Sequence, residues 1–126
     1  MDGLKNKKTF ISGFLILALA VILGAFGAHG LEKHLSDKAL ETYKTGNFYH
    51  FIHGLAWIFL ALFEQNTRKS FNLSKVLLGL GLTFFTGFCY LYAMTSIKFL
   101  ALLIPLGGIA YTLFWFRLAY IVWKIK

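Results

Sequence analysis

The feature that most constrains this chain is a series of long apolar stretches that are almost free of charge. Four such stretches cover residues 9–28, 48–63, 76–97 and 99–123, with a single charged residue among them. A helix needs about 20 apolar residues to cross the hydrocarbon core of a membrane, and within lipid it satisfies its own backbone hydrogen bonds. The alternation that marks a β-strand is absent. The sequence therefore predicts an all-α membrane protein in which residues 1–126 form one domain, a bundle of four transmembrane helices.

The composition agrees with this prediction. Hydrophobic residues make up 58% of the chain and charged residues 14%, whereas a soluble domain carries about 25% charged residues. So few charges cannot cover the surface of a soluble enzyme of this length, and a disordered tail is excluded for the same reason. The net charge of +8 does not predict nucleic-acid binding, because the basic residues lie between the apolar stretches rather than on one folded face.

The first stretch has an alternative interpretation as a cleaved signal peptide. It follows a basic segment and contains small residues at Ala18, Ala20 and Ala25. It is longer than the usual hydrophobic region of a signal peptide, so we expect it to remain as the first span.

The distribution of Lys and Arg predicts how the bundle is oriented in the membrane. Eight basic residues fall on the side of the two termini: Lys5, Lys7, Lys8, Arg68, Lys69, Lys75, Lys124 and Lys126. Four fall on the other side: Lys33, Lys38, Lys44 and Lys98. We therefore expect a multi-pass protein of the cell inner membrane with both termini cytoplasmic.

The loop between the first two spans carries the pattern of a short amphipathic helix. Ser36 is a favourable N-cap, and apolar residues recur at helical spacing up to Thr45. Gly46 fits a C-terminal stop. The sequence predicts a surface helix over Ser36–Thr45, and a solvated connector is the alternative.

Small residues repeat at four-residue intervals in two of the spans. They are Ala20, Gly24 and Ala28 in the first span, and Gly79, Thr83 and Gly87 in the third. Because lipid supplies no hydrophobic force between helices, small residues that let backbones approach each other are typical of helix–helix contacts in membranes. We expect these stripes to face the bundle interior or to mediate a dimer.

The histidines lie in or beside the first loop, at the outer end of the predicted bundle. His53 falls several residues inside the second span, where an ionisable side chain is costly and indicates a function. With neighbouring residues it defines a candidate polar pocket of the outer leaflet: His29, Tyr49, His50, His53 and Tyr90.

A helix break is predicted beside this pocket, in the fourth span. Pro105 removes a backbone donor, and Gly107 and Gly108 weaken the helix further. Irregular backbone at membrane depth occurs only where protein or a polar cavity surrounds it.

Several chemistries remain open for the pocket. The histidines can simply hydrogen-bond within the bundle and stabilise it. A metal site formed by His29, His50, His53 and Glu32 is one alternative, and haem ligation by His29 and His53 is another. A proton relay, or a pocket for a quinone or a lipid headgroup, is also compatible with imidazole chemistry. The residues do not identify a cofactor.

Four motifs resemble those of a known family of small membrane proteins. They are G-A-F-G-A-H-G (Gly24–Gly30), Y-H-F-I-H-G-L-A (Tyr49–Ala56), F-T-G-F-C-Y (Phe85–Tyr90) and P-L-G-G (Pro105–Gly108). The chain resembles the family catalogued as domain of unknown function 423, whose eukaryotic relatives are called transmembrane protein 256. The resemblance implies a multi-spanning inner-membrane protein and implies no activity.

No enzyme motif is present, neither a phosphate-binding loop nor a dinucleotide fingerprint nor a zinc-protease signature. We therefore expect a non-enzymatic accessory or interaction subunit, as a homo-oligomer or within a larger membrane complex. The alternative is a binding or transport module that uses the His/Tyr pocket for a metal, haem, quinone or lipid.

Overall fold

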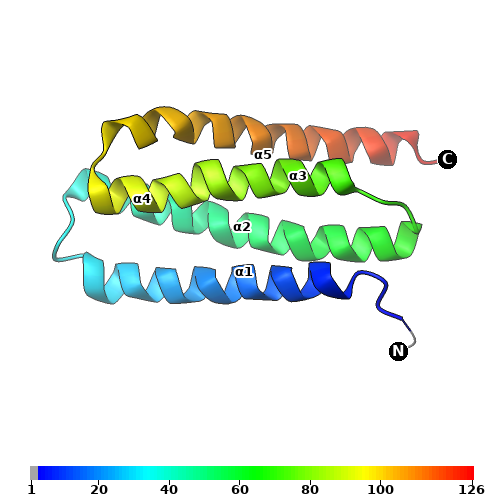
Figure 1. Ribbon diagram of the computed structural model, residues 1–126, viewed down its shortest axis with the longest axis horizontal. Helices are drawn as coiled ribbons and strands as arrows, with labels where there is room; N and C mark the ends of the chain where they lie inside the picture. Colours follow the sequence, from blue (N-terminus) through cyan, green and yellow to red (C-terminus); the bar gives the residue numbers. More distant parts are fainter. Residues whose placement is uncertain (1–2) are drawn as a thin grey trace.

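The computed structural model describes residues 3–126, and its helices form four long rods (Figure 1). The first rod is α1 (Lys7–Phe26) with η1 (Gly27–Leu31), the second is α2 (Asp37–Thr67), the third is α3 (Asn72–Gly81), η2 (Leu82–Gly87) and α4 (Phe88–Thr95), and the fourth is α5 (Lys98–Lys124). All four are long and apolar enough to cross a membrane. The predicted fold class, an all-α bundle of four spans, is confirmed.

The rods follow one another as an open row rather than a closed ring. Each rod packs on the next one along the chain, while within residues 3–126 the backbones of α1 and α5 do not approach each other. Figure 1 shows this order, with α1 and α5 on opposite sides and α2 and α3–α4 between them. The start of α1 and the end of α5 lie at the same end of the bundle. Because the row is not closed into a ring, α1 and α5 each pack against a neighbouring rod on one side only.

The surface helix predicted over Ser36–Thr45 is not a separate element. Ser36 is the N-cap, and its Oγ accepts a hydrogen bond from the backbone N–H of Ala39 at 3.2 Å. The helix that begins there continues without interruption to Thr67. The prediction of the cap was therefore right, and the prediction of a boundary before the second span was wrong.

Gly46 lies inside α2, and its lack of a side chain serves a helix contact instead of a helix end. A Cβ atom at this position would lie 2.6 Å from the Cβ atom of Cys89 in α4. Two helices that approach this closely need a glycine at the crossing point. The sequence pattern alone does not distinguish such a glycine from a C-terminal stop.

The two stripes of small residues have different surroundings. In the first rod, Ala20 is fully buried and a Cβ atom on Gly24 would lie 2.9 Å from Oδ1 of Asn47, whereas Ala28 is exposed. Ala20 and Gly24 of this stripe therefore pack against α2, and Ala28 does not. In the third rod, a Cβ atom on Gly79 would meet only Trp57 at 3.9 Å, and Thr83 is exposed. Thr83 and Gly87 line an open groove between the first and third rods, so this stripe is only partly covered.

The helix break predicted at Pro105 is absent, because α5 runs as one helix from Lys98 to Lys124 with Pro105 inside it. Proline removes its own N–H bond and crowds the carbonyl four residues before it, and transmembrane helices tolerate this when neighbouring helices support them. Gly107, two residues further on, lets such a neighbour approach closely. A Cβ atom on Gly107 would lie 2.6 Å from the carbonyl carbon of Phe84 and 2.7 Å from Cα of Phe85. The motif therefore brings the backbone of α5 against that of η2.

Candidate functional site

The polar residues of the bundle gather near the middle of the membrane-spanning length, around two histidines of α2. Because α2 begins at Asp37, His53 lies close to the midpoint of this helix. It is therefore deeper than a span beginning at Phe48 predicts. His50 and His53 are 4% and 3% exposed, and each takes part in a separate set of hydrogen bonds.

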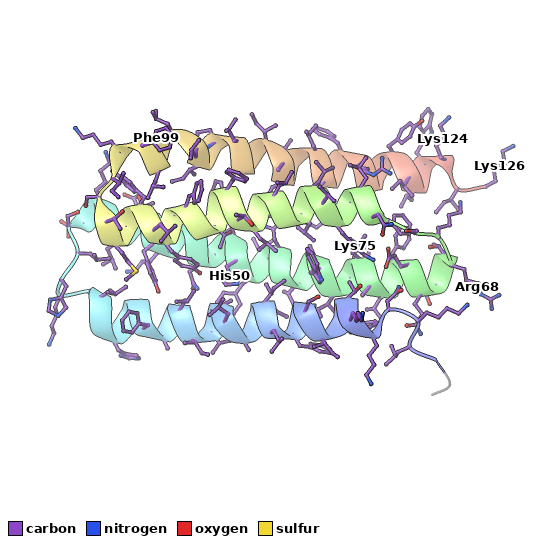
Figure 2. All side chains as sticks on the ribbon, in the orientation of Figure 1. His50, Arg68, Lys75, Phe99, Lys124 and Lys126 are labelled. Carbon is purple, nitrogen blue, oxygen red and sulfur yellow. The ribbon has the colours of Figure 1, made fainter. Side chains whose placement is uncertain are left out.

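His50 belongs to a network that ties α2 to α1 and α4. Nδ2 of Asn47 donates to the carbonyl oxygen of Ala20 at 2.9 Å and to the hydroxyl of Tyr90 at 3.0 Å. The Tyr90 hydroxyl is 2.9 Å from Nδ1 of His50. Since this hydroxyl already accepts from Asn47, it is free to donate its own proton to His50. Figure 2 shows His50 between α2 and α1, in agreement with this network.

His53 belongs to a second network, which ties α2 to α5. Its Nδ1 donates to the carbonyl oxygen of Tyr49 at 2.8 Å, and its Nε2 accepts from the indole N–H of Trp115 at 3.1 Å. A ring with one donating and one accepting nitrogen is the neutral tautomer protonated at Nδ1. The imidazole also stacks on the ring of Tyr111, with centroids 3.5 Å apart and an interplanar angle of 12°. Both nitrogens and one face of His53 are therefore occupied.

The π-helix η2 lies between these two networks. Its Thr86 is buried, and Oγ1 of Thr86 is 2.7 Å from the hydroxyl of Tyr111. The ring of Tyr49 packs between Phe85 and Tyr111, at centroid distances of 4.5 and 6.1 Å. π-turns are rare, and they occur frequently at functional sites. Here the π-helix η2 holds Phe85, which packs on Tyr49 of α2, and Thr86, which is bonded to Tyr111 of α5.

The structure separates His29 from the other residues of the predicted pocket. His29 lies in η1 and is exposed, whereas His50 and His53 are buried. Within residues 3–126, no three side chains of His, Cys, Asp or Glu come together in a way that can hold a metal ion. A haem bound by His29 and His53 would require His53 to give up its bond to Trp115. Among the described residues, the metal hypothesis therefore lacks a ligand set, and the haem hypothesis joins one buried histidine to one exposed histidine.

A groove open to the membrane runs between α2 and α5. Its deeper part is a cavity of about 520 Å³ that includes Tyr49, His53 and Trp115 in its lining. Its outer part is a cavity of about 380 Å³. The two share Phe85 and Pro105. We call them together the α2–α5 groove, which is lined among others by Lys38, Glu41, Thr45, Phe48, Tyr49, His53, Phe85, Pro105, Tyr111 and Trp115.

In the deeper part of this groove, the hydroxyl of Tyr49 is a polar group that remains available to a ligand. Tyr49 is half-buried, and its hydroxyl makes no hydrogen bond with the residues that the structure describes. The other tyrosines of the site, Tyr90 and Tyr111, use their hydroxyls within the bundle.

Several residues of the site are not evident from the sequence. Asn47, Thr86, Tyr111 and Trp115 each hydrogen-bond to another rod. Tyr111 and Trp115 are four residues apart and so lie on one helix face, which is the signal that could have found them. Thr86 gives no such signal, because it depends on the π-turn around it.

Comparison with known proteins gives the same family that the motifs suggest. Residues 23–108 match the family described as "Protein of unknown function (DUF423)". A UPF0382 membrane protein of Staphylococcus haemolyticus is 38% identical over 112 residues, which cover 89% of this chain and 92% of that protein. One from Bacillus subtilis is 37% identical over 111 residues, which cover 86% of this chain and 90% of that protein. No solved structure matches the chain. The chain therefore belongs to the DUF423 family, a family of membrane proteins whose function is unknown.

Proposed function

We propose that this chain is a non-enzymatic protein of the cytoplasmic membrane that binds one membrane lipid in the α2–α5 groove. The observation that carries the proposal is the continuity of the groove, from a charged outer end at Lys38 and Glu41 to the aromatic floor around His53. Ligand sites of this kind combine apolar walls with a few placed polar groups.

The dimensions of the groove fit a lipid of a single leaflet. Lys38 and His53 are both in α2, and at 1.5 Å per residue they are about 22 Å apart along the helix. One leaflet, including its headgroups, is about 20 Å thick. A lipid can therefore place its headgroup near Lys38 and Glu41, and its acyl chains along Phe48 and Ile109.

The buried polar side chains support a non-enzymatic role. A catalytic acid or base needs a group that can reach a substrate. The ring nitrogens of His53 and the hydroxyls of Tyr90 and Tyr111 are instead engaged in bonds between rods. This leaves Tyr49, whose hydroxyl suits the orientation of a lipid ester or headgroup.

The proposed orientation follows from charge. The excess of basic residues on the side of the termini supports cytoplasmic ends, and α1 starts at the end of the bundle where α5 finishes. The outer end of the groove then opens toward the outer leaflet.

The lipid assignment is tested by native mass spectrometry of protein extracted from its membrane in mild detergent. Ile109 lines the groove and is 56% exposed. Ile109→Trp should therefore fill part of the groove without disturbing the packing of the rods. We expect Ile109→Trp to retain close to one lipid per chain fewer than the wild-type protein.

Leu113→Trp is the matched control, because Leu113 is one turn further along α5, is 50% exposed and lies outside the lining of the groove. It should retain lipid as the wild type does. Equal retention in all three proteins, or no retained lipid in any, would refute the proposal. A retained quinone in place of a lipid would overturn the ligand class.

A second candidate function, as a subunit that associates through the third rod, is favoured by the stripe of Gly79, Thr83 and Gly87. Small-residue stripes mediate helix contacts in membranes. Thr83 is exposed, and with Gly87 it lines an open groove beside α1 that a helix of another chain can enter. In a Cys89→Ala background, Thr83→Cys should form disulfide-linked dimers on mild oxidation in native membranes. Leu113→Cys on α5 is the control. Absence of Thr83→Cys dimers, or equal dimer formation in both variants, would count against a homo-oligomer.

A further inference from the structure

The end of the bundle at which α2 passes into α3 holds a cavity of a different kind. Its volume is about 320 Å³. Six of its lining residues define what we call the basic cavity: Lys5, Asn6, Glu64, Arg68, Lys69 and Lys75. Figure 2 shows Arg68 at the end of the bundle that also carries Lys124 and Lys126, with Lys75 further inward. We propose that the basic cavity binds the phosphate group of an anionic phospholipid.

Glu64, the carboxylate that lines the cavity, is already neutralised inside the bundle. Glu64 is 5% exposed. Its Oε1 accepts a hydrogen bond from the backbone N–H of Phe71 at 2.8 Å, and its Oε2 is 2.8 Å from Nζ of Lys75. Glu64 therefore holds the loop and Lys75 in place. The charges of Lys5, Arg68 and Lys69 are left to face a ligand.

The other carboxylates that the structure describes are too far away to compete. Glu32, Asp37 and Glu41 lie between the end of α1 and the first turns of α2, at the opposite end of the bundle. Within residues 3–126, the pair Lys75–Glu64 is the only salt bridge. Among the residues that the structure describes, no carboxylate side chain pairs with Lys5, Arg68 or Lys69, so these cations are available to an anion.

The first turn of α3 contributes positive potential to the basic cavity, whereas the carbonyl end of α2, in the same loop, contributes negative potential that the basic side chains outweigh. α3 begins at Asn72, with no side-chain cap and no acidic residue in its first turn. The free N–H groups of such a turn attract anions. α2 ends in the same loop, where Arg68 adopts a left-handed conformation (φ 56°) and donates its N–H to the carbonyl oxygen of Glu64.

The surroundings favour a lipid over a free ion. Leu73 and Val76, in the first turns of α3, are 51% and 55% exposed. They continue the apolar surface of the spans up to the basic cavity. Basic pockets between transmembrane helices at the cytoplasmic surface bind anionic headgroups. A phospholipid can contact the cations with its phosphate and these side chains with its acyl chains.

The test uses purified full-length protein in detergent micelles, where membrane orientation has no influence. Phosphatidylglycerol, phosphatidylcholine or inorganic phosphate is added, and bound lipid is counted by native mass spectrometry. We expect phosphatidylglycerol to bind with at least tenfold preference over phosphatidylcholine. The triple variant Lys5→Gln, Arg68→Asn, Lys69→Gln should lose this preference, since each basic residue contributes about fivefold. Asn is chosen at position 68 because it tolerates the left-handed conformation.

The control variant Lys8→Gln, Lys124→Gln, Lys126→Gln removes the same charge from exposed positions at the same end. It should keep the preference. Equal loss in both variants, or no loss in either, would overturn the proposal. Displacement of phosphatidylglycerol by millimolar inorganic phosphate would assign the site to the free ion instead. If the triple variant does not give the helical circular dichroism of the wild type, the single variant Lys69→Glu, at an exposed position, replaces it.

Discussion

Replacing Gly107 with alanine is expected to destabilise the bundle strongly. The effect should exceed that of Gly→Ala at positions where the new methyl group meets only a flexible side chain. The new Cβ atom would lie within 2.7 Å of backbone atoms of both Phe84 and Phe85. Backbone atoms cannot rotate away as a flexible side chain does, so α5 must move off η2. Overpacking typically costs 1–3 kcal/mol, and we expect a loss of about 3 kcal/mol or more in the free energy of unfolding.

The measurement is unfolding by sodium dodecyl sulfate in mixed micelles, followed by circular dichroism. Gly108→Ala is the matched control at the next residue, because a Cβ atom there would lie 3.6 Å from the Phe85 ring, which is an ordinary contact. Gly108→Ala should be neutral or slightly stabilising, since alanine favours a helix over glycine by about 1 kcal/mol. Equal stability of the two variants would disprove the close approach of α5 to η2.

Replacing His53 with alanine is expected to have the second large effect. It removes the stacking contact with Tyr111, empties space in a region where the side chain is 3% exposed, and leaves the Trp115 N–H without an acceptor. Truncation of large buried side chains costs about 3–5 kcal/mol. We expect a loss of about 3 kcal/mol in the same unfolding experiment.

Two further variants separate the contributions to this loss. His53→Phe keeps a ring against Tyr111 and loses only the hydrogen bonds, so it should cost about 1 kcal/mol. His29→Ala should change stability little, because His29 is exposed. If His29→Ala is as damaging as His53→Ala, the separation of the two histidines described above is wrong.

Much of the fold could be predicted because its determinants are local. Three of the four apolar stretches are by themselves long enough to span the membrane, and the Ser36 cap depends on residues within one turn. The ends of the helices could not be predicted as well. Gly46 and Pro105 both predict a helix end or break, yet both lie inside continuous helices. Each is accommodated by a contact with another rod, which a single stretch of sequence does not contain.

The structure brings some of the predicted pocket residues together and separates others. His50, His53, Tyr49 and Tyr90 lie in the two networks or beside them, whereas His29 does not. The reason is the starting point of α2. A helix that begins at Asp37 instead of Phe48 places His53 near the middle of the bundle, where it meets Tyr111 and Trp115.

The sequence by itself therefore determined that the chain forms four helices apolar enough to cross a membrane, and which of their ends carry the basic charge. These properties follow from the cost of placing charged or unbonded polar groups in lipid, and that cost is set residue by residue. Only the tertiary structure decided which polar side chains meet, which glycines touch a backbone and where grooves remain open. Those outcomes depend on the rotation and register of one rod against the next, and a single π-turn such as η2 changes both.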